Sequence, residues 1–348
     1  MHFASDNSGP AHPRVMAALI AANEGYAASY GDDPIMEDVR AQIRGIFEAP
    51  EAAVYLVING TAANALLLSA MTKPWETIFC SECAHINEDE CNAPEFYTGA
   101  KLTLVPTADG KMAPGGLRQK ILGEENRGVH GPQRGPLSIT QVTEKGTLYT
   151  LDEIRALTTI AREFGMQTHL DGARFANALT ALESSPAEMT WKAGVDTVSF
   201  GGTKNGVLGV EACIIFNPEI AWEFELRRKR GGHLLSKHRY LSAQMQAYLT
   251  DGLWLDMARS ANARCARLAA GLQGLRDLKT LFAPQANMIF FEMPRREHKR
   301  MLDAGAVYHL MNGDHEAGDP HEPLIGRLVC DWSMTEDSID QFLDLLRG

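Results

Sequence analysis

Short apolar runs alternate with helical patterns along the first two-thirds of the chain. The clearest run, at 54–58, is almost continuously apolar, which is typical of a strand covered on both faces. Further strands are predicted at 77–80, 102–106, 137–142, 167–170, 197–200 and 212–216. Helical patterns lie between several of them, most clearly at 151–164. This alternation predicts an α/β fold, a doubly wound and mainly parallel sheet.

The pattern changes after about residue 250. Long helical patterns at roughly 238–276 lead to a strand at 288–292 and a helix near 295–304. Strands near 306–309 and 325–330 follow, and a last helix at 335–347. We therefore predict a large domain over 1–250 and a smaller α+β domain over 251–348.

Composition excludes several classes of protein. The chain has 348 residues, and its 33 basic and 44 acidic residues give a net charge of −11, which argues against a nucleic-acid partner. No apolar run approaches the ~20 residues of a membrane span. The first residues show no basic segment followed by an apolar one, so we expect no secretory signal and a cytoplasmic enzyme.

Cysteine and histidine occur close together after the second predicted strand. Cys80, Cys83, His85 and Cys91 supply four possible zinc ligands within twelve residues. However, Cys80 ends an apolar strand, and the second ligand pair of a zinc ribbon is missing. Packed thiols are therefore favoured over a metal site. The His- and Asp-rich loop 309–321 is likewise interpreted as a surface loop, so no metal is predicted.

A polar turn at 59–62 follows the first predicted strand and opens a helix. Backbone N–H groups and the helix dipole make such a turn a phosphate cradle, here with Gly60, Thr61 and Ala62. Alone, the turn fits an ordinary helix cap better. The full glycine fingerprints of Rossmann and P-loop enzymes are not seen at this turn, which counts against both classes.

Three further residues follow other predicted strands. His85 could stack on a planar cofactor, Asp171 could either bind it or cap the helix at 174–182, and Lys204 lies in a glycine-rich turn at 201–206. Strand ends of an open parallel sheet share one edge, where ligands bind. An acid that keeps a pyridine nitrogen protonated and a lysine that forms a Schiff base are what pyridoxal phosphate (PLP) requires.

These motifs also carry a resemblance to a known family. The chain is similar to the low-specificity L-threonine aldolases of the β-eliminating lyase group, which are fold-type I PLP enzymes. The resemblance runs through Ser5-Asp6, Tyr-Gly-Asp-Asp-Pro at 30–34, residues 60–64, Ala84-His85, Asp171–Arg174, Lys204 and 327–329. It implies a seven-stranded, mainly parallel sheet, no membrane, and a homotetramer built from dimers with active sites at the dimer interface.

The resemblance implies a role for each matching residue. Lys204 would bind the PLP aldehyde, Asp171 its nitrogen, and His85 its ring, while Gly60, Thr61 and Ala62 would hold its phosphate. Substrate would contact the following residues: Ser5, Tyr30, Arg174 and Arg327. Arg174 could instead lie near the cofactor's O3′. Lys229 and Arg230, in the basic run 227–230, would reach a phosphate across the dimer interface.

One position departs from the family pattern. Many members have a histidine after the fourth strand, where this chain has Thr143 or Glu144. The catalytic base is therefore open between His85, Glu144 and an ordered water. The same change could favour bulkier substrates such as phenylserine.

The expected reaction is retro-aldol cleavage of L-threonine, L-allo-threonine and related 3-hydroxy amino acids to glycine and an aldehyde. The alternatives are a phenylserine-preferring aldolase and another fold-type I β-lyase or racemase. Rivals from other classes are a PLP-binding protein without catalysis and a Rossmann NAD enzyme. The product pair, aldehyde with glycine or pyruvate with ammonia, separates aldol cleavage from β-elimination.

Overall fold

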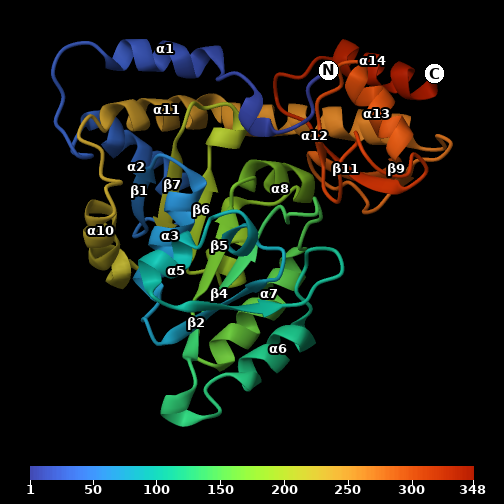
Figure 1. Cartoon of the computed structure of the whole chain (residues 1–348). Helices are drawn as coiled ribbons and strands as arrows, with labels where there is room; N and C mark the ends of the chain where they lie inside the picture. Colours follow the sequence, from blue (N-terminus) through green and yellow to red (C-terminus); the bar gives the residue numbers. More distant parts are fainter.

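The larger of two sheets has seven strands. The computed structural model describes all 348 residues, and the strand order is β1-β7-β6-β5-β4-β2-β3 (Figure 1). The strands are β1 (Ala53–Val57), β2 (Glu76–Ser81), β3 (Lys101–Val105), β4 (Gln133–Thr140), β5 (Thr168–Gly172), β6 (Thr197–Gly201) and β7 (Glu211–Ile215). Only β7 runs antiparallel to its neighbours. The predicted mainly parallel α/β sheet is confirmed.

Helices cover both faces of this sheet, and the last two helices of the chain belong to a second sheet. The helices are α1 (Pro13–Ala22), α2 (Pro34–Ile46), α3 (Gly60–Met71), α4 (His85–Glu88), α5 (Ala93–Thr98), α6 (Pro114–Gly123), α7 (Leu151–Glu163), α8 (Phe175–Leu182), α9 (Pro186–Met189), α10 (Ala221–Arg230), α11 (Arg239–Leu249), α12 (Leu253–Leu272), α13 (Arg295–Asp303) and α14 (Glu336–Arg347). None is long and apolar enough to cross a membrane.

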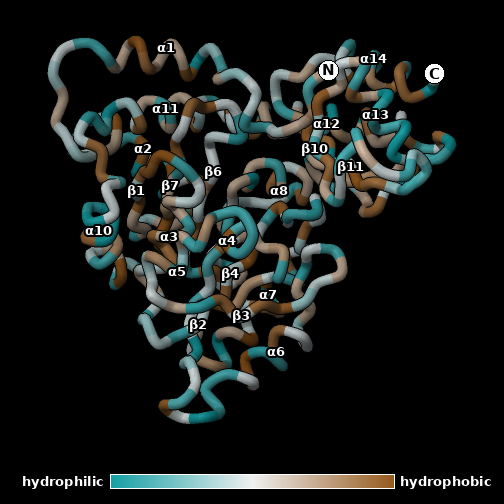
Figure 2. The backbone as a smooth tube through the Cα atoms, viewed as in Figure 1, coloured by the Kyte–Doolittle hydropathy of each residue, from teal (hydrophilic) through white to brown (hydrophobic).

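Side chains along each strand point alternately to the two faces of the sheet, which creates two separate apolar cores. On β1, Val54 and Leu56 join the large cluster that includes side chains of α2, α7, α8 and α12, whereas Tyr55 and Val57 join the cluster of α3 and α10. Successive strand residues point to opposite faces, so one apolar run supplies both cores. Apolar stretches accordingly follow the strands and the helices against them in Figure 2.

The second sheet has four antiparallel strands, in the order β10-β11-β9-β8. They are β8 (Lys279–Thr280), β9 (Met288–Pro294), β10 (His309–Leu310) and β11 (Pro323–Val329). This sheet lies with α13 and α14 at the far end of α12, beside both chain termini (Figure 1). Phe3 joins it by a hydrogen bond from its N–H to the Val307 carbonyl at 2.7 Å and one from the Val329 N–H at 2.9 Å.

The boundaries differ from prediction at several places, among them β4, which begins at Gln133 and not at 137. The helical pattern at 238–276 is broken into α11 and α12, because Asp251 and Gly252 have positive φ values of 55° and 71°. The strand expected near 306–309 begins only at His309. The helix break coincides with the boundary predicted at residue 250, but the division into two domains stays a prediction.

Candidate active site

Lys204 lies in a rigid turn after β6. Its neighbour Asn205 donates from Nδ2 to the Tyr248 hydroxyl and the Trp254 carbonyl, both at 2.8 Å. Gly206 has φ 95°, and a Cβ there would lie 2.6 Å from Met257 Sδ, so only glycine fits. The turn therefore presents Lys204 in one defined place.

The electrostatic surroundings of Lys204 favour a neutral amine. Burial lowers its pKa, and the Arg174 charge lowers it further, while Asp6, Asp171 and Glu211 oppose the shift. A neutral amine is the form that attacks a carbonyl. Of these carboxyl groups, Glu211 is itself buried, which raises its pKa to about 7.

Asp171 ends β5 with 3% of its surface exposed. Its Oδ1 accepts from the Ala173 N–H at 3.0 Å, and its Oδ2 accepts from Asn64 Nδ2 at 2.8 Å. The alternative role as a cap of α8 is wrong, because Arg174 occupies the N-cap position and no side chain caps that helix. Asp171 instead belongs to a buried polar network.

His85 is the first residue of α4, and its side chain is 36% exposed. Its Nδ1 lies 2.8 Å from Oε1 of the buried Glu90, and its backbone N–H donates to Glu144 Oε1 at 2.8 Å. The hydrogen bond to Glu90 is the main reason that the pKa of His85 is raised. The imidazole is therefore held at its Nδ1 side.

Glu144 and Thr143 are the two candidates for the position where the family pattern has a histidine, and their side chains have different partners. Thr143 is fully buried, and its hydroxyl hydrogen-bonds the Thr147 hydroxyl at 2.7 Å. Glu144 reaches His85, and its Oε2 is enclosed without a hydrogen-bond partner. Burial raises the pKa of Glu144 to about 7. Of the two, Glu144 is the residue placed beside His85.

Arg174 is engaged by Asp6, a residue to which the sequence analysis assigned no role. Asp6 accepts from Arg174 Nε at 2.7 Å and Nη2 at 2.9 Å, and from Asn287 Nδ2 at 3.0 Å. Burial alone raises the pKa of Asp6, but the Arg174 and Lys204 charges outweigh it and lower the pKa. Ser5 lies beside this pair, its hydroxyl accepting from the Asn7 N–H.

Arg327, on β11, has more free capacity. It donates from Nη2 to the Ala4 carbonyl at 3.2 Å, while its Nε is enclosed and has no partner. An enclosed, unpartnered guanidinium donor is costly unless a ligand satisfies it. Arg327 therefore fits the predicted substrate carboxylate better than Arg174 does.

The start of α3 has free backbone amides of the kind that the predicted phosphate cradle requires. Asn59 caps the helix, and its Oδ1 accepts from the Ala62 N–H at 2.8 Å. The N–H groups of Gly60 and Thr61 precede any intrahelical acceptor, so they remain available to an anion. With Lys204 and Asp171 these amides form a donor and acceptor set that fits PLP; the role of Ala62 stays a prediction.

The basic run and Tyr30 lie together on the surface. Lys229 and Arg230 are exposed at the end of α10, and the Lys229 ammonium lies 4.6 Å from the Tyr30 ring centroid. Arg228 is instead buried and donates to the Leu56 carbonyl at 3.4 Å. The predicted cross-subunit contact of Lys229 and Arg230 stays a prediction.

Two buried residues of the site had no assigned role in the sequence analysis. Asn64 Nδ2 donates to Glu90 Oε1 at 2.9 Å and to Asp171, and Asn64 Oδ1 accepts from the Ser199 hydroxyl at 2.7 Å. Asn64 is the last residue of the motif at 60–64, which was a usable signal. Glu90 stands among several polar residues at 87–92, and nothing in that segment distinguishes it.

Comparison with known proteins yields one consistent family. Residues 2–294 match the family model described as "Beta-eliminating lyase". The chain is 38% identical over 348 residues to the low specificity L-threonine aldolase of Pseudomonas sp. (strain NCIMB 10558), covering 99% of this chain and 97% of that protein. The solved structure of Leishmania major threonine aldolase superposes with a TM-score of 0.91 at 25% identity, covering 99% of this chain and 98% of that one.

Proposed function

This chain belongs to the β-eliminating lyase family, and from that premise we propose that it is a PLP-dependent aldehyde-lyase. It cleaves L-threonine, L-allo-threonine and related L-3-hydroxy amino acids to glycine and an aldehyde. The observation that supports this function is that Lys204 lies within the fields of Asp171 and Arg174, and that Arg327, whose Nε has no partner, lies within the field of Arg174 too. The curated relatives of the same length are named for this activity.

The residues that would hold PLP come from four strand ends. The amides of Gly60 and Thr61 would bind its phosphate, Asp171 its ring nitrogen, and Lys204 its aldehyde carbon, with His85 against the ring. When bound, PLP supplies the electron sink that makes a carbanion at Cα accessible. Every other requirement of the reaction falls to side chains of the chain itself.

Substrate orientation falls to the carboxylate clamp. Arg327 would bind the carboxylate through its guanidinium group, whose Nε has no partner within the chain, and Ser5 is the second predicted contact. Fixing the carboxylate selects which bond of Cα stands ready to break. Arg174 acts beside it as a fixed positive charge, since Asp6 already holds two of its nitrogens.

Cleavage then requires one proton to leave the β-hydroxyl. The Cα–Cβ bond breaks, its electron pair remains on Cα, the hydroxyl oxygen becomes the aldehyde oxygen, and Cα takes a proton to give glycine. His85 Nε2 and Glu144 Oε2 are the two candidate acceptors, with an ordered water as the alternative. Glu144, with a pKa raised to about 7, is matched to proton transfer at neutral pH.

The test is a set of kinetic assays with threonine, allo-threonine and phenylserine. Formation of glycine and aldehyde is expected, whereas pyruvate and ammonia, or racemisation alone, would refute aldol cleavage. Because Thr143 or Glu144 is expected where the resemblance predicts a histidine, a preference for phenylserine is the second candidate. His85→Asn and Glu144→Gln, assayed side by side, separate the two proposed bases.

We infer a homotetramer, a dimer of dimers, as the assembly. Supporting it, several large apolar side chains are exposed on α1, the following loop and α10: Met16, Ile20, Tyr26, Tyr30, Trp222 and Leu226. Lys229 and Arg230 would then extend toward the partner's phosphate site. Sedimentation equilibrium tests the assembly, and a monomer at micromolar concentration would exclude it. We further propose a cytoplasmic location, where the six free thiols stay reduced.

A further inference from the structure

A chain of buried hydrogen bonds joins His85 to Asp171. Glu90 Oε1 contacts His85 Nδ1 at 2.8 Å and Asn64 Nδ2 at 2.9 Å, and the same Nδ2 reaches Asp171 Oδ2 at 2.8 Å. Glu90, Asn64 and Asp171 are all less than 5% exposed. The two residues that are expected to contact the cofactor are thus connected through the buried side chains of Glu90 and Asn64.

Chemistry fixes the direction of these hydrogen bonds. Two carboxyl oxygens accept, so the group between them must be the Asn64 NH₂, which has two hydrogens to donate. The Asn64 oxygen then faces Ser199, whose hydroxyl lies 3.0 Å from His169 Nε2. Burial lowers the pKa of His169 to about 4, so a neutral His169 supports this arrangement.

The same logic fixes the tautomer of His85. A carboxylate that already accepts from Asn64 also accepts from His85, so Nδ1 carries the hydrogen. Nε2, the other ring nitrogen, is left as the atom that can exchange a proton with substrate. The charged and titratable groups around His85 are Glu90, Asp171, Lys204 and Glu144, and only Glu90 contacts its ring nitrogen.

We propose that Glu90 and Asn64 are positioning residues: Glu90 holds the proton on Nδ1 of His85, and Asn64 ties that carboxyl group to Asp171. The proposal deepens the proposed aldolase function and rests on it for its catalytic consequence. With the proton held on Nδ1, Nε2 is the ring nitrogen of His85 that can accept a proton from the substrate. Asn64 fixes the position of the Asp171 carboxyl group relative to Glu90, and through Glu90 relative to the His85 ring.

The experiment compares Glu90→Gln with Glu88→Gln, a matched control two residues earlier, at the end of α4, whose side chain is exposed. Nitrogen-15 NMR of the histidine rings, in enzyme with and without PLP, reports tautomer and titration, and His85→Asn assigns the signal. In the wild type His85 should be the Nδ1–H tautomer. Glu90→Gln should mix the tautomers and lower the pKa of His85, and kcat should fall roughly 10- to 100-fold with little change in KM.

Each outcome decides something. If His85 in Glu90→Gln keeps the wild-type tautomer and titration, the proposal is wrong whatever the activity. If Glu90→Gln does not fold, Glu90→Asp replaces it: the carboxylate remains, but one methylene shorter it cannot span Asn64 and His85, so the tautomers should again mix. If the wild type cleaves no 3-hydroxy amino acid while the NMR result holds, the aldolase function fails and the positioning of His85 stands.

Discussion

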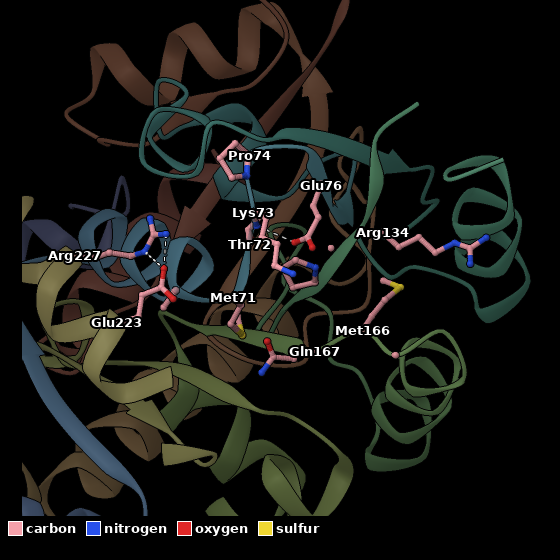
Figure 3. Close-up of a pocket in the computed structure, with 14 residues that line it drawn as sticks. Met71, Thr72, Lys73, Pro74, Glu76, Arg134, Met166, Gln167, Glu223 and Arg227 are labelled. Carbon is pink, nitrogen blue, oxygen red and sulfur yellow. Dashed lines mark hydrogen bonds and ion pairs between the residues drawn. The ribbon is translucent and has the colours of Figure 1, made fainter. Parts of the chain in front are cut away.

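Charged side chains are exposed to solvent at one end of the large sheet and enclosed at the other. At the amino ends of β2, β4 and β5 a surface cavity of about 340 Å³ is lined by Lys73, Glu76, Arg134, Glu223 and Arg227 (Figure 3). An ion pair among these residues lies where water can reach it: Arg227 and Glu223 are 29% and 53% exposed. Pairs of this kind contribute little to stability.

At the carboxyl ends the charges are enclosed. Asp6 and Glu90 have almost no exposed side chain, and Glu90 Oε2, Glu144 Oε2 and Arg327 Nε have no partner. Enclosing an unsatisfied charged group costs free energy, so such groups persist where a ligand or a reaction uses them. A cavity alone therefore does not identify the site, whereas several unsatisfied buried charges beside the strand ends that carry Asp171 and Lys204 support it.

The largest effect is expected at Lys204. Lys204→Ala removes the only amine proposed to bond the PLP aldehyde, so kcat should fall by roughly 10⁴-fold or more. The absorbance of PLP joined to the enzyme should disappear with it. A variant that kept both turnover and that absorbance would show that Lys204 does not bond PLP, and the active site would no longer be assigned to the carboxyl ends of the sheet.

Asp171→Asn should come next. The amide is nearly the same shape but carries no charge, so it cannot hold the cofactor nitrogen in its protonated form. The rate should drop by about two to three orders of magnitude. Steady-state kinetics at saturating PLP measure it, and near-normal activity would remove the assigned role.

Arg327→Gln sharpens the comparison by contrasting an arginine of the proposed active site with one at the amino ends of the large sheet. Losing a charged donor to the substrate carboxylate should cost about 2 kcal/mol, which raises KM about 30-fold. Arg134→Gln, at the cavity, is the control and should leave KM unchanged. Equal effects of the two substitutions would contradict the assignment of Arg327.

Glu144→Gln should act on stability in a pH-dependent way. Because burial raises the pKa of Glu144 to about 7 from 4.5, its favourable contribution is complete below pH 4.5 and is lost as pH rises through 7. The variant should gain stability over wild type across that range, on the order of 1–3 kcal/mol. Urea unfolding at pH 5 and pH 8 checks the sign, and an advantage that is larger at pH 5 would reverse it.

The smallest effect is expected at Arg227. Arg227→Gln breaks an exposed pair with Glu223, so the free energy of unfolding should change by less than about 0.5 kcal/mol. kcat/KM should remain at the wild-type value. A large loss of activity would show that the amino ends of the sheet take part in function, which would contradict the assignment of the active site to the carboxyl ends alone.

Strand ends were predictable from the sequence because buried strands are continuously apolar and stop at glycine or a polar residue. That rule located Gly60, His85, Asp171 and Lys204 at one edge. The partners between them were not predictable, since Glu90 looks like its acidic neighbours until the fold encloses it. Arg174 and Arg327 were likewise indistinguishable in the sequence, because only the position of Asp6 decides which guanidinium is free.

The attachment of the N-terminal segment has a consequence for the order of events during synthesis. Asp6 binds Asn287 across 281 positions of sequence, and Phe3 pairs with Val307 and Val329. The segment therefore leaves the ribosome long before any of these partners exists. The same segment supplies the counter-ion of Arg174, so this contact of the site is made by a part of the chain that is also attached to the small sheet. We expect competence to bind substrate to be acquired last, as a step distinct from formation of the main core.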